Sequence, residues 1–400
     1  MVKLKVMKYL LKTLIILFPI ILNASEIRGY VVGQIRAQTP TLKDNPRSFG
    51  TLALENINRI NYFNEMNKFQ FEIGLEFNQI LQWTHDPLQE RNFEKTNTPY
   101  RLEDFRPTVL TSKSGINSYY LLKQLDRLQL HYSFYSFDIT LGRQQISFGS
   151  AKLVNPTDVF TPFSPTTINT EEKNGVDALR IKKTFGPNTE AEIGILFGNK
   201  FKEENSALFI RSIFSYKELE IKPILLSYRE ALGVGIDFLV PYKGAHFYIE
   251  SLSTFIDKKN FHSYNRTTAG IEYQWSNDLF FVVEYHYNGD GRGDTTEYDL
   301  KGLSFSRSRG SSFYLARHYF NFMLNYQLTP LHILTLTSYQ NLNDGSNLFA
   351  PSWSWSFSEN STLGFGLFIG VGKETNNPFQ VKSEFGSYGK QFFSKYTYYF

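Results

Sequence analysis

Cysteine is absent from this sequence of 400 residues, so disulfide bonds, thiolate metal sites and thiol catalysis are excluded. Beyond residue 25, no apolar run approaches the roughly 18 residues that a membrane-spanning helix needs. The signatures of nucleophile-elbow hydrolases, zinc proteases, P-loop proteins and dinucleotide-binding domains are missing as well. We therefore expect no enzyme activity, no metal site and no cofactor.

Net charge is also absent once the N-terminus is set aside. Residues 1–25 contain four lysines, then an apolar run over 14–22 and the small or polar residues Asn23, Ala24 and Ser25, a pattern typical of a cleaved secretory signal peptide. Cleavage after Ala24 and cleavage after Ser25 both remain open. Without these four lysines, the 42 basic residues of the chain fall to 38 and equal its 38 acidic residues. A nucleic-acid partner is therefore not expected.

Aromatic residues, in contrast, are abundant, with 37 Phe and 25 Tyr. Many fall in segments of about ten residues in which apolar and polar side chains alternate. In residues 68–78, Phe69, Phe71 and Ile73 share one face with two further apolar residues, and polar or charged residues and one Gly occupy the other face. Because successive side chains of a strand point to opposite faces, this pattern predicts a strand with one apolar and one polar face.

Eighteen such segments can be placed along the chain, and together they predict an all-β fold. They cover residues 28–38, 49–62, 68–82, 120–134, 137–148, 175–184, 189–199, 206–216, 218–228, 232–240, 245–256, 265–275, 279–289, 314–327, 332–342, 350–358, 361–373 and 390–400. The long connections all fall at the same edge of the predicted sheet: 83–119, 149–174, 290–313 and 374–389.

Outer-membrane barrels have short periplasmic turns and long external loops, and their strands alternate between apolar and polar side chains. The segments therefore predict a transmembrane antiparallel β-barrel of about eighteen strands, formed as a single domain by residues 26–400. Sixteen strands is the alternative, because residues 49–62 alternate poorly.

The last ten residues, 391–400, support the same prediction. Phe392, Tyr396, Tyr398 and Phe400 share one face, while polar residues including Gln391, Lys395 and Thr397 lie on the other. A soluble edge strand with this aromatic face would aggregate, whereas in a membrane barrel the face meets lipid and both edges are paired. The segment resembles the C-terminal insertion signal of bacterial outer-membrane barrels, which the assembly machinery reads. The resemblance implies these four aromatic residues as the signal and that machinery as a partner.

A second resemblance lies in residues 141–165. Gly142, Arg143 and Gln144 are followed by Gly149 and then by Asn155, Pro156 and Asp158. This stretch resembles one in large porin-like outer-membrane barrels, where a Gly-Arg-Gln strand end runs through a Gly into Asn-Pro-x-Asp. The resemblance covers about twenty-five residues and implies an outer-membrane channel without naming a substrate.

The loop 149–174 is the best candidate for narrowing the channel, because an eighteen-stranded barrel alone leaves a wide opening. Its prolines make it stiff, and Asp158 would lie near the lumen bases Arg180 and Lys182. Arg143 breaks the alternation of its strand, so either it sits at the outer rim or a bulge near Gly142 turns it inward. We therefore predict Arg143, Asp158, Arg180 and Lys182 as pore or constriction residues.

The function that follows is passive diffusion of small hydrophilic solutes or ions across the bacterial outer membrane. The alternatives are a barrel that exports a polysaccharide, a barrel enzyme and an adhesin. The expected partners are outer-membrane lipid and lipopolysaccharide, the assembly machinery and the solutes. The sequence leaves the solute, the ion selectivity and the choice between monomer and oligomer open.

Overall fold

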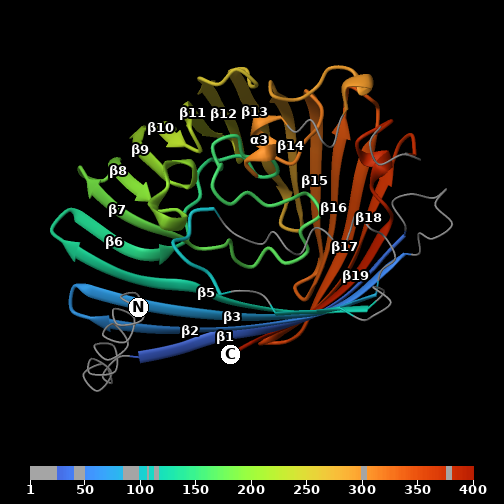
Figure 1. The fold of residues 1–400 in the computed structure, drawn as a ribbon, viewed down its shortest axis with the longest axis horizontal. Helices are drawn as coiled ribbons and strands as arrows, with labels where there is room; N and C mark the ends of the chain where they lie inside the picture. Colours follow the sequence, from blue (N-terminus) through green and yellow to red (C-terminus); the bar gives the residue numbers. More distant parts are fainter. Residues whose placement is uncertain are drawn as a thin grey trace.

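The computed structural model describes residues 25–39, 50–83, 99–105, 108–111, 117–298, 304–374 and 381–400. Within these residues, nineteen strands form one sheet (Figure 1). Residues 1–24, which contain most of the predicted signal peptide, lie outside the described part. Among the described residues, no helix is both long and apolar enough to cross a membrane.

The strands follow one another along the chain and are joined edge to edge. They are β1 Ser25–Gln38, β2 Thr51–Met66, β3 Phe69–Trp83, β4 Thr108–Thr111, β5 Asn117–Phe134, β6 Phe137–Gln144, β7 Val176–Thr184, β8 Thr189–Leu196, β9 Ala207–Tyr216, β10 Leu219–Tyr228, β11 Ala231–Tyr242, β12 Ala245–Ile256, β13 Tyr264–Ser276, β14 Leu279–Asn288, β15 His318–Thr329, β16 His332–Asn341, β17 Asn347–Ser358, β18 Ser361–Val371 and β19 Gln391–Tyr399. Short helical turns lie between some of them: η3 Asn199–Phe201, η4 Glu203–Asn205, η5 Thr295–Glu297, α3 Phe305–Ser308 and η6 Phe385–Ser387.

The sheet closes on itself, because β1 pairs antiparallel with both β2 and β19. The four-residue β4 pairs only with residues 118–121 of β5. On that edge β6 pairs with residues 128–134 of β5 and does not extend as far as β4. In the described part of the chain, the closed ring therefore contains the other eighteen strands, all antiparallel to their neighbours. This confirms the predicted barrel and its count of eighteen, and the alternative of sixteen is wrong.

The strand that alternated poorly, β2, does so because two amides interrupt its outward face. Asn56 and Asn58 face outward together with Leu52, Leu54 and Ile60, while Ala53, Ile57 and Arg59 are buried on the inner face. The period of two is therefore intact, but amides occur on the outer face and apolar side chains on the inner face.

The two faces of the wall differ sharply. On the terminal strand β19, Phe392, Tyr396, Tyr398 and Phe400 are exposed on the outside, as the sequence predicted. The inner face contains Phe393 and Tyr399 in addition to the predicted Gln391, Lys395 and Thr397. The backbone of Phe400 exchanges two hydrogen bonds with Gly29, so the last residue completes the seam between β19 and β1.

The chain between β6 and β7, residues 145–175, does not project away from the barrel but is enclosed by the strands (Figure 1). We call it the inner segment. Ile146, Phe148 and Phe160 of this segment pack with Phe209 of β9 and Leu252 of β12 in a buried apolar cluster. The part of the lumen next to β8–β12 is therefore filled, and any open passage must lie on the opposite side.

Candidate functional site: a passage narrowed by the inner segment

A glycine starts the inward path of the chain. Gly142 near the end of β6 has a φ of +113°, and a Cβ there would lie 2.0 Å from the carbonyl oxygen of Leu128. This left-handed backbone turns Arg143 into the barrel, where its Nε lies 2.7 Å from Asp177 and its Nη1 lies 2.8 Å from Asp104. Of the two predicted positions for Arg143, the structure therefore shows the inward one.

Buried carboxylates on the barrel wall anchor the first half of the inner segment. Glu284 of β14 accepts hydrogen bonds from the backbone N–H groups of Lys152, Leu153 and Val154, at 2.7, 3.0 and 3.0 Å. Glu250 of β12 accepts from the N–H and the hydroxyl of Thr157, both at 2.7 Å. Because buried backbone N–H groups need acceptors, these contacts fix the backbone of the segment against the wall.

The carbonyl groups of the same stretch are also satisfied. Arg266 of β13 donates to the carbonyl oxygen of Pro156 at 2.8 Å, and Thr268 donates to that of Val154 at 2.8 Å. Gly149 lies where a Cβ would approach the Glu250 carboxylate to 2.3 Å, and its φ of +95° also favours glycine. Polar groups of a buried loop need partners, and here the wall supplies them.

The second half of the inner segment is held by the other side of the barrel. Glu171 accepts hydrogen bonds from Lys395 and Tyr399 of β19, at 2.7 and 2.9 Å. Glu172 forms ion pairs with Arg59 of β2 at 2.6 Å and Arg127 of β5 at 2.9 Å. The segment is thus fixed to β12–β14 in its first half and to β2, β5 and β19 in its second half, so it crosses the lumen.

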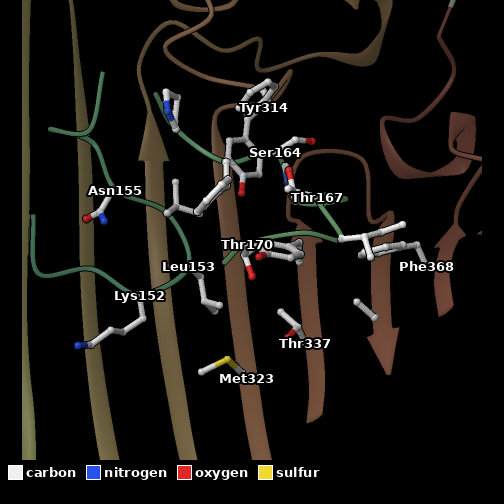
Figure 2. Close-up of a pocket in the computed structure, with 18 of the residues that line it drawn as sticks. Lys152, Leu153, Asn155, Ser164, Thr167, Thr170, Tyr314, Met323, Thr337 and Phe368 are labelled. Carbon is white, nitrogen blue, oxygen red and sulfur yellow. The ribbon is translucent and has the colours of Figure 1, made fainter. Parts of the chain in front are cut away.

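Between the inner segment and strands β15–β19 lies a cavity of about 590 Å³, which we take as the candidate passage. Figure 2 shows Ser164, Thr167 and Thr170 of the inner segment beside strands that carry Met323, Thr337 and Phe368. About half of the lining residues are hydroxyl or aromatic, and most of the rest are aliphatic or proline. The hydroxyl and aromatic residues are Ser164, Thr167, Thr170, Ser311, Ser312, Thr337, Ser352, Phe163, Phe313, Tyr314, Tyr339, Phe368 and Phe393. Its charged residues are Lys152, Asp158, Lys173 and Arg266.

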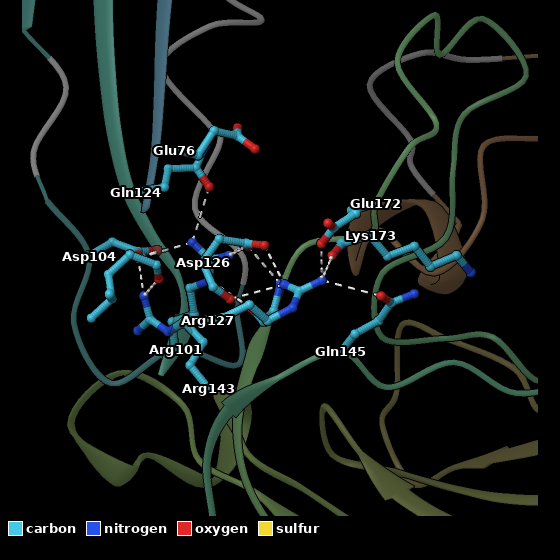
Figure 3. A network of polar contacts seen from close by, with 12 residues as sticks. Glu76, Arg101, Asp104, Gln124, Asp126, Arg127, Arg143, Gln145, Glu172 and Lys173 are labelled. Atoms are coloured by element: carbon cyan, nitrogen blue, oxygen red, sulfur yellow. Dashed lines mark hydrogen bonds and ion pairs between the residues drawn. The ribbon is translucent and has the colours of Figure 1, made fainter. Parts of the chain in front are cut away.

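A network of arginines and carboxylates braces the wall beside the second half of the segment (Figure 3). Asp126 of β5 lies at its centre, 2.8 Å from Arg59 and 2.7 Å from Arg101, and it also pairs with Arg127. Asp126 is only 2% exposed, so the three cations offset a large desolvation cost. Gly74 of β3 pairs with Arg127 and Leu75 pairs with Leu125, so Asp126 is an extra residue in β5 at this register shift. Consecutive strand residues normally face opposite sides, but here Asp126 and Arg127 both face the inside.

Three of the predicted constriction residues do not form the expected group. Asp158 is buried and pairs with Lys173 of its own segment rather than with Arg180 or Lys182. Arg180 pairs with Glu192 of β8, and Lys182 lies 3.5 Å from Asp138 and from Glu190. The expected eyelet is therefore wrong, because the inner faces of β6 and β8 carry carboxylates that engage these two bases. Burial raises the pKa of Asp158 above its usual value, and the nearby Lys173 opposes this effect.

Of the four charged residues that line the passage, Asp158 was singled out by the sequence prediction, whereas Lys152 and Lys173 of the inner segment and Arg266 of β13 were not. Lys395, which was assigned to the lumen, holds Glu171 of the inner segment. In the described ranges, no three His, Asp or Glu side chains are grouped so as to hold a metal ion.

A buried acid ties together the connections at the loop edge of β15–β19. Glu384, 1% exposed, accepts hydrogen bonds from the N–H of Leu315 at 2.9 Å, from the Tyr319 hydroxyl and from Asn341 at 2.9 Å. Burial raises the pKa of Glu384 from 4.5 to about 7, with a further contribution from Asp344, whereas Tyr319, the Leu315 N–H and Arg307 act in the opposite direction.

This pKa predicts that residues 381–390, which Glu384 holds against the loop edge of β15–β19, detach more readily as the pH rises above about 7. The docked state favours protonated Glu384, so its contribution to docking is fully present below about pH 4.5 and is lost as the pH rises through about 7. Hydrogen exchange of residues 381–390, corrected for intrinsic rates, should be faster at pH 8 than at pH 5. Glu384→Gln should abolish the difference, and equal protection of the native protein at both pH values would contradict the prediction.

No protein-family model matches the sequence, and no curated protein matches it. Solved structures do resemble the fold. OccAB4 of Acinetobacter baumannii aligns over 94% of this chain and 99% of its own at 11% identity, with a TM-score of 0.56. OccD3 (OpdP) of Pseudomonas aeruginosa aligns over 95% and 92% at 6% identity, and A. baumannii OccAB2 over 94% and 98% at 9% identity, both with a TM-score of 0.56. At these identities the similarity concerns the fold.

Proposed function

We propose that this chain is a bacterial outer-membrane channel through which small hydrophilic solutes and ions diffuse passively. The observation that carries the proposal is a closed barrel with an apolar outside, in which a segment anchored on both sides leaves a cavity lined in part by hydroxyl groups. Barrels of sixteen to eighteen strands leave an aqueous channel.

The outer surface supports the membrane location. Tyr135, Tyr216, Tyr242 and Trp275 are all more than half exposed at the edge of the barrel where the short turns lie. Aromatic side chains gather at the boundary between lipid and water in such barrels. Insertion would require the barrel-assembly machinery, and the surrounding partners would be outer-membrane lipid and lipopolysaccharide.

The passage is better suited to small solutes than to a polysaccharide. The inner segment is held by Glu250 and Glu284 in its first half and by Arg59, Arg127 and Lys395 in its second, so it cannot move aside without breaking contacts on one of the two sides. The exporter alternative needs an opening that admits a long polymer, and this crossing segment is an obstacle to it.

Recording from planar lipid bilayers tests the proposal. The purified protein should form ohmic channels, and changing both Lys152 and Lys173 to Glu should shift the reversal potential in a KCl gradient toward cation preference, because both lysines line the passage. The shift should shrink in 1 M salt, where the screening length falls to about 3 Å.

Lys202→Glu is the matched control, since Lys202 is an exposed lysine outside the passage. This control should leave the reversal potential unchanged. Absence of any current from folded protein would contradict the proposed function, whereas current without a shift in the double variant would remove only Lys152 and Lys173 from the ion path.

A further inference from the structure

Four polar side chains interrupt the apolar outer face of the barrel between β2 and β5. Asn56 and Asn58 of β2, Gln79 of β3 and Lys123 of β5 all face outward, and Gln79 and Lys123 are exposed. The residues on either side of them along the strands are apolar and exposed: Ile60 and Leu75 toward the turns, Leu54 and Leu81 toward the loops. The four residues, which we call the outer polar patch, are therefore a local feature of this face.

The strand register brings the four residues together. Asn56 lies directly opposite Gln79, and Asn58 and Lys123 lie on the two sides of Phe77 in the next outward-facing row. The Asn58 amide donates a hydrogen bond to the Oδ1 atom of Asn56. Gly33 of β1 is opposite Asn56, and a Cβ there would meet nothing within 4 Å, so the surface beside the patch is open.

The height of the patch can be estimated from the strand geometry. Gln79 is ten residues from Phe69 at the turn edge of β3. At about 3.3 Å per residue and a tilt of roughly 40°, this separation corresponds to about 25 Å along the barrel axis. The apolar band of an outer-membrane barrel is also about 25 Å tall. Gln79 and the opposite Asn56 therefore lie at the boundary between the apolar band and the lipid headgroups, in the leaflet next to the long loops. Lys123 lies one row nearer the turns, about 20 Å up by the same geometry, and its long side chain can extend to that boundary.

The charge of the patch selects the kind of headgroup. Lys123 is the sole charged side chain among the described outward-facing residues of β1, β2, β3 and β5 between the turn and loop edges, and no carboxylate accompanies it there. An ammonium group beside amide N–H donors matches a phosphate group, which offers a negative charge and several acceptor oxygens.

We propose that the outer polar patch binds the phosphate group of a phosphorylated lipid in the outer leaflet, with Lys123 supplying the charge and the amides of Asn56 and Gln79 supplying hydrogen bonds. The proposal rests on the membrane location proposed above. The acyl chains of such a lipid would lie along Phe77, Leu75 and Ile60, which continue the same face toward the turns.

Native mass spectrometry of the detergent-solubilised barrel with diphosphoryl lipid A tests this site. The native protein should retain the lipid, and Lys123→Gln should weaken binding about tenfold. Asn56→Leu with Gln79→Leu should weaken it further, while heat-resistant folding is kept because all three residues face outward. Dephosphorylated lipid A should bind with the affinity of the Lys123→Gln variant. Millimolar inorganic phosphate should not compete, since a free ion lacks the acyl contacts.

Lys183→Gln is the control, because Lys183 is a cation at the opposite, turn edge, where it stacks over Phe137 and Phe185. Lipid binding should be unaffected by this change. Equal binding by native protein and Lys123→Gln, or an equal loss in Lys183→Gln, would overturn the site. The assay measures lipid retention rather than current. A protein that conducts ions but does not bind the lipid would contradict the lipid site alone, and a protein that binds the lipid without conducting would contradict the proposed channel alone.

Discussion

Replacing residues 152–166 with a short Gly-Ser linker should raise single-channel conductance several-fold. These residues include the stretch that Glu284, Arg266 and Thr268 hold against the wall, and they contribute most of one side of the passage. Without them, the lumen of an eighteen-stranded barrel would be limited mainly by its wall side chains, which leave a wide aqueous channel.

Point variants separate removal of the segment from loss of its anchors. The double variant Glu250→Ala, Glu284→Ala keeps the inner segment in the chain but removes the acceptors for the N–H groups of Lys152, Leu153, Val154 and Thr157. We expect frequent transitions between conductance levels rather than one uniformly larger level, because the segment would sample positions away from the wall. Glu218→Ala, an exposed acid in a turn, should behave like the native protein.

Planar-bilayer recording decides the matter, with heat-resistant gel migration as the check that each variant is folded. Conductance that stays at the native level after the replacement would mean that the inner segment lies outside the ion path. The proposed constriction would then have to be abandoned, although the barrel would remain.

The strands could be predicted from sequence because each of them repeats a simple physical requirement. A strand between lipid and water needs apolar and polar side chains at a period of two, and turn residues mark where each strand ends. Even β2, where Asn56 and Asn58 face outward, kept the correct phase. The missed strand β4 has four residues and a single partner, so it has no such repeat.

The site was harder to predict because alternation assigns a face but not a neighbour. Arg180 and Lys182 were correctly placed on the inner face, yet their partners are Glu192, Glu190 and Asp138 on adjacent strands. Asp126 was missed because the register shift at Gly74 brings it inside against the alternation. Glu250 lies between Tyr248 and Leu252 on the inner face of β12, and an acid flanked by large apolar residues is a signal that could have identified an anchor.

The terminal strand provides the other large expected effect. Changing Tyr398 and Phe400 to Asp should reduce the folded, heat-modifiable protein in the outer membrane at least tenfold and increase periplasmic degradation. Both side chains are exposed on the outer face, and the backbone of Phe400 pairs with Gly29 at the seam. An Arg or Lys on the lipid face costs roughly 2–4 kcal/mol at the midplane but about 0–1 kcal/mol near the interface, where these residues lie, and Asp costs less.

Loss of folded protein could follow from loss of the insertion signal or from the charge on the lipid face. Because the cost of a charge at the interface is small, these two causes can be distinguished. Leu328→Asp with Leu331→Asp places the same charges on exposed positions at the turn edge of β15 and β16, without touching the terminus. If the terminal aromatic residues act as an insertion signal, this control should lose far less folded protein than the variant of Tyr398 and Phe400. Equal losses would mean that both variants suffer only from charge at the lipid boundary, and normal levels of the terminal variant would show that neither residue is needed for assembly.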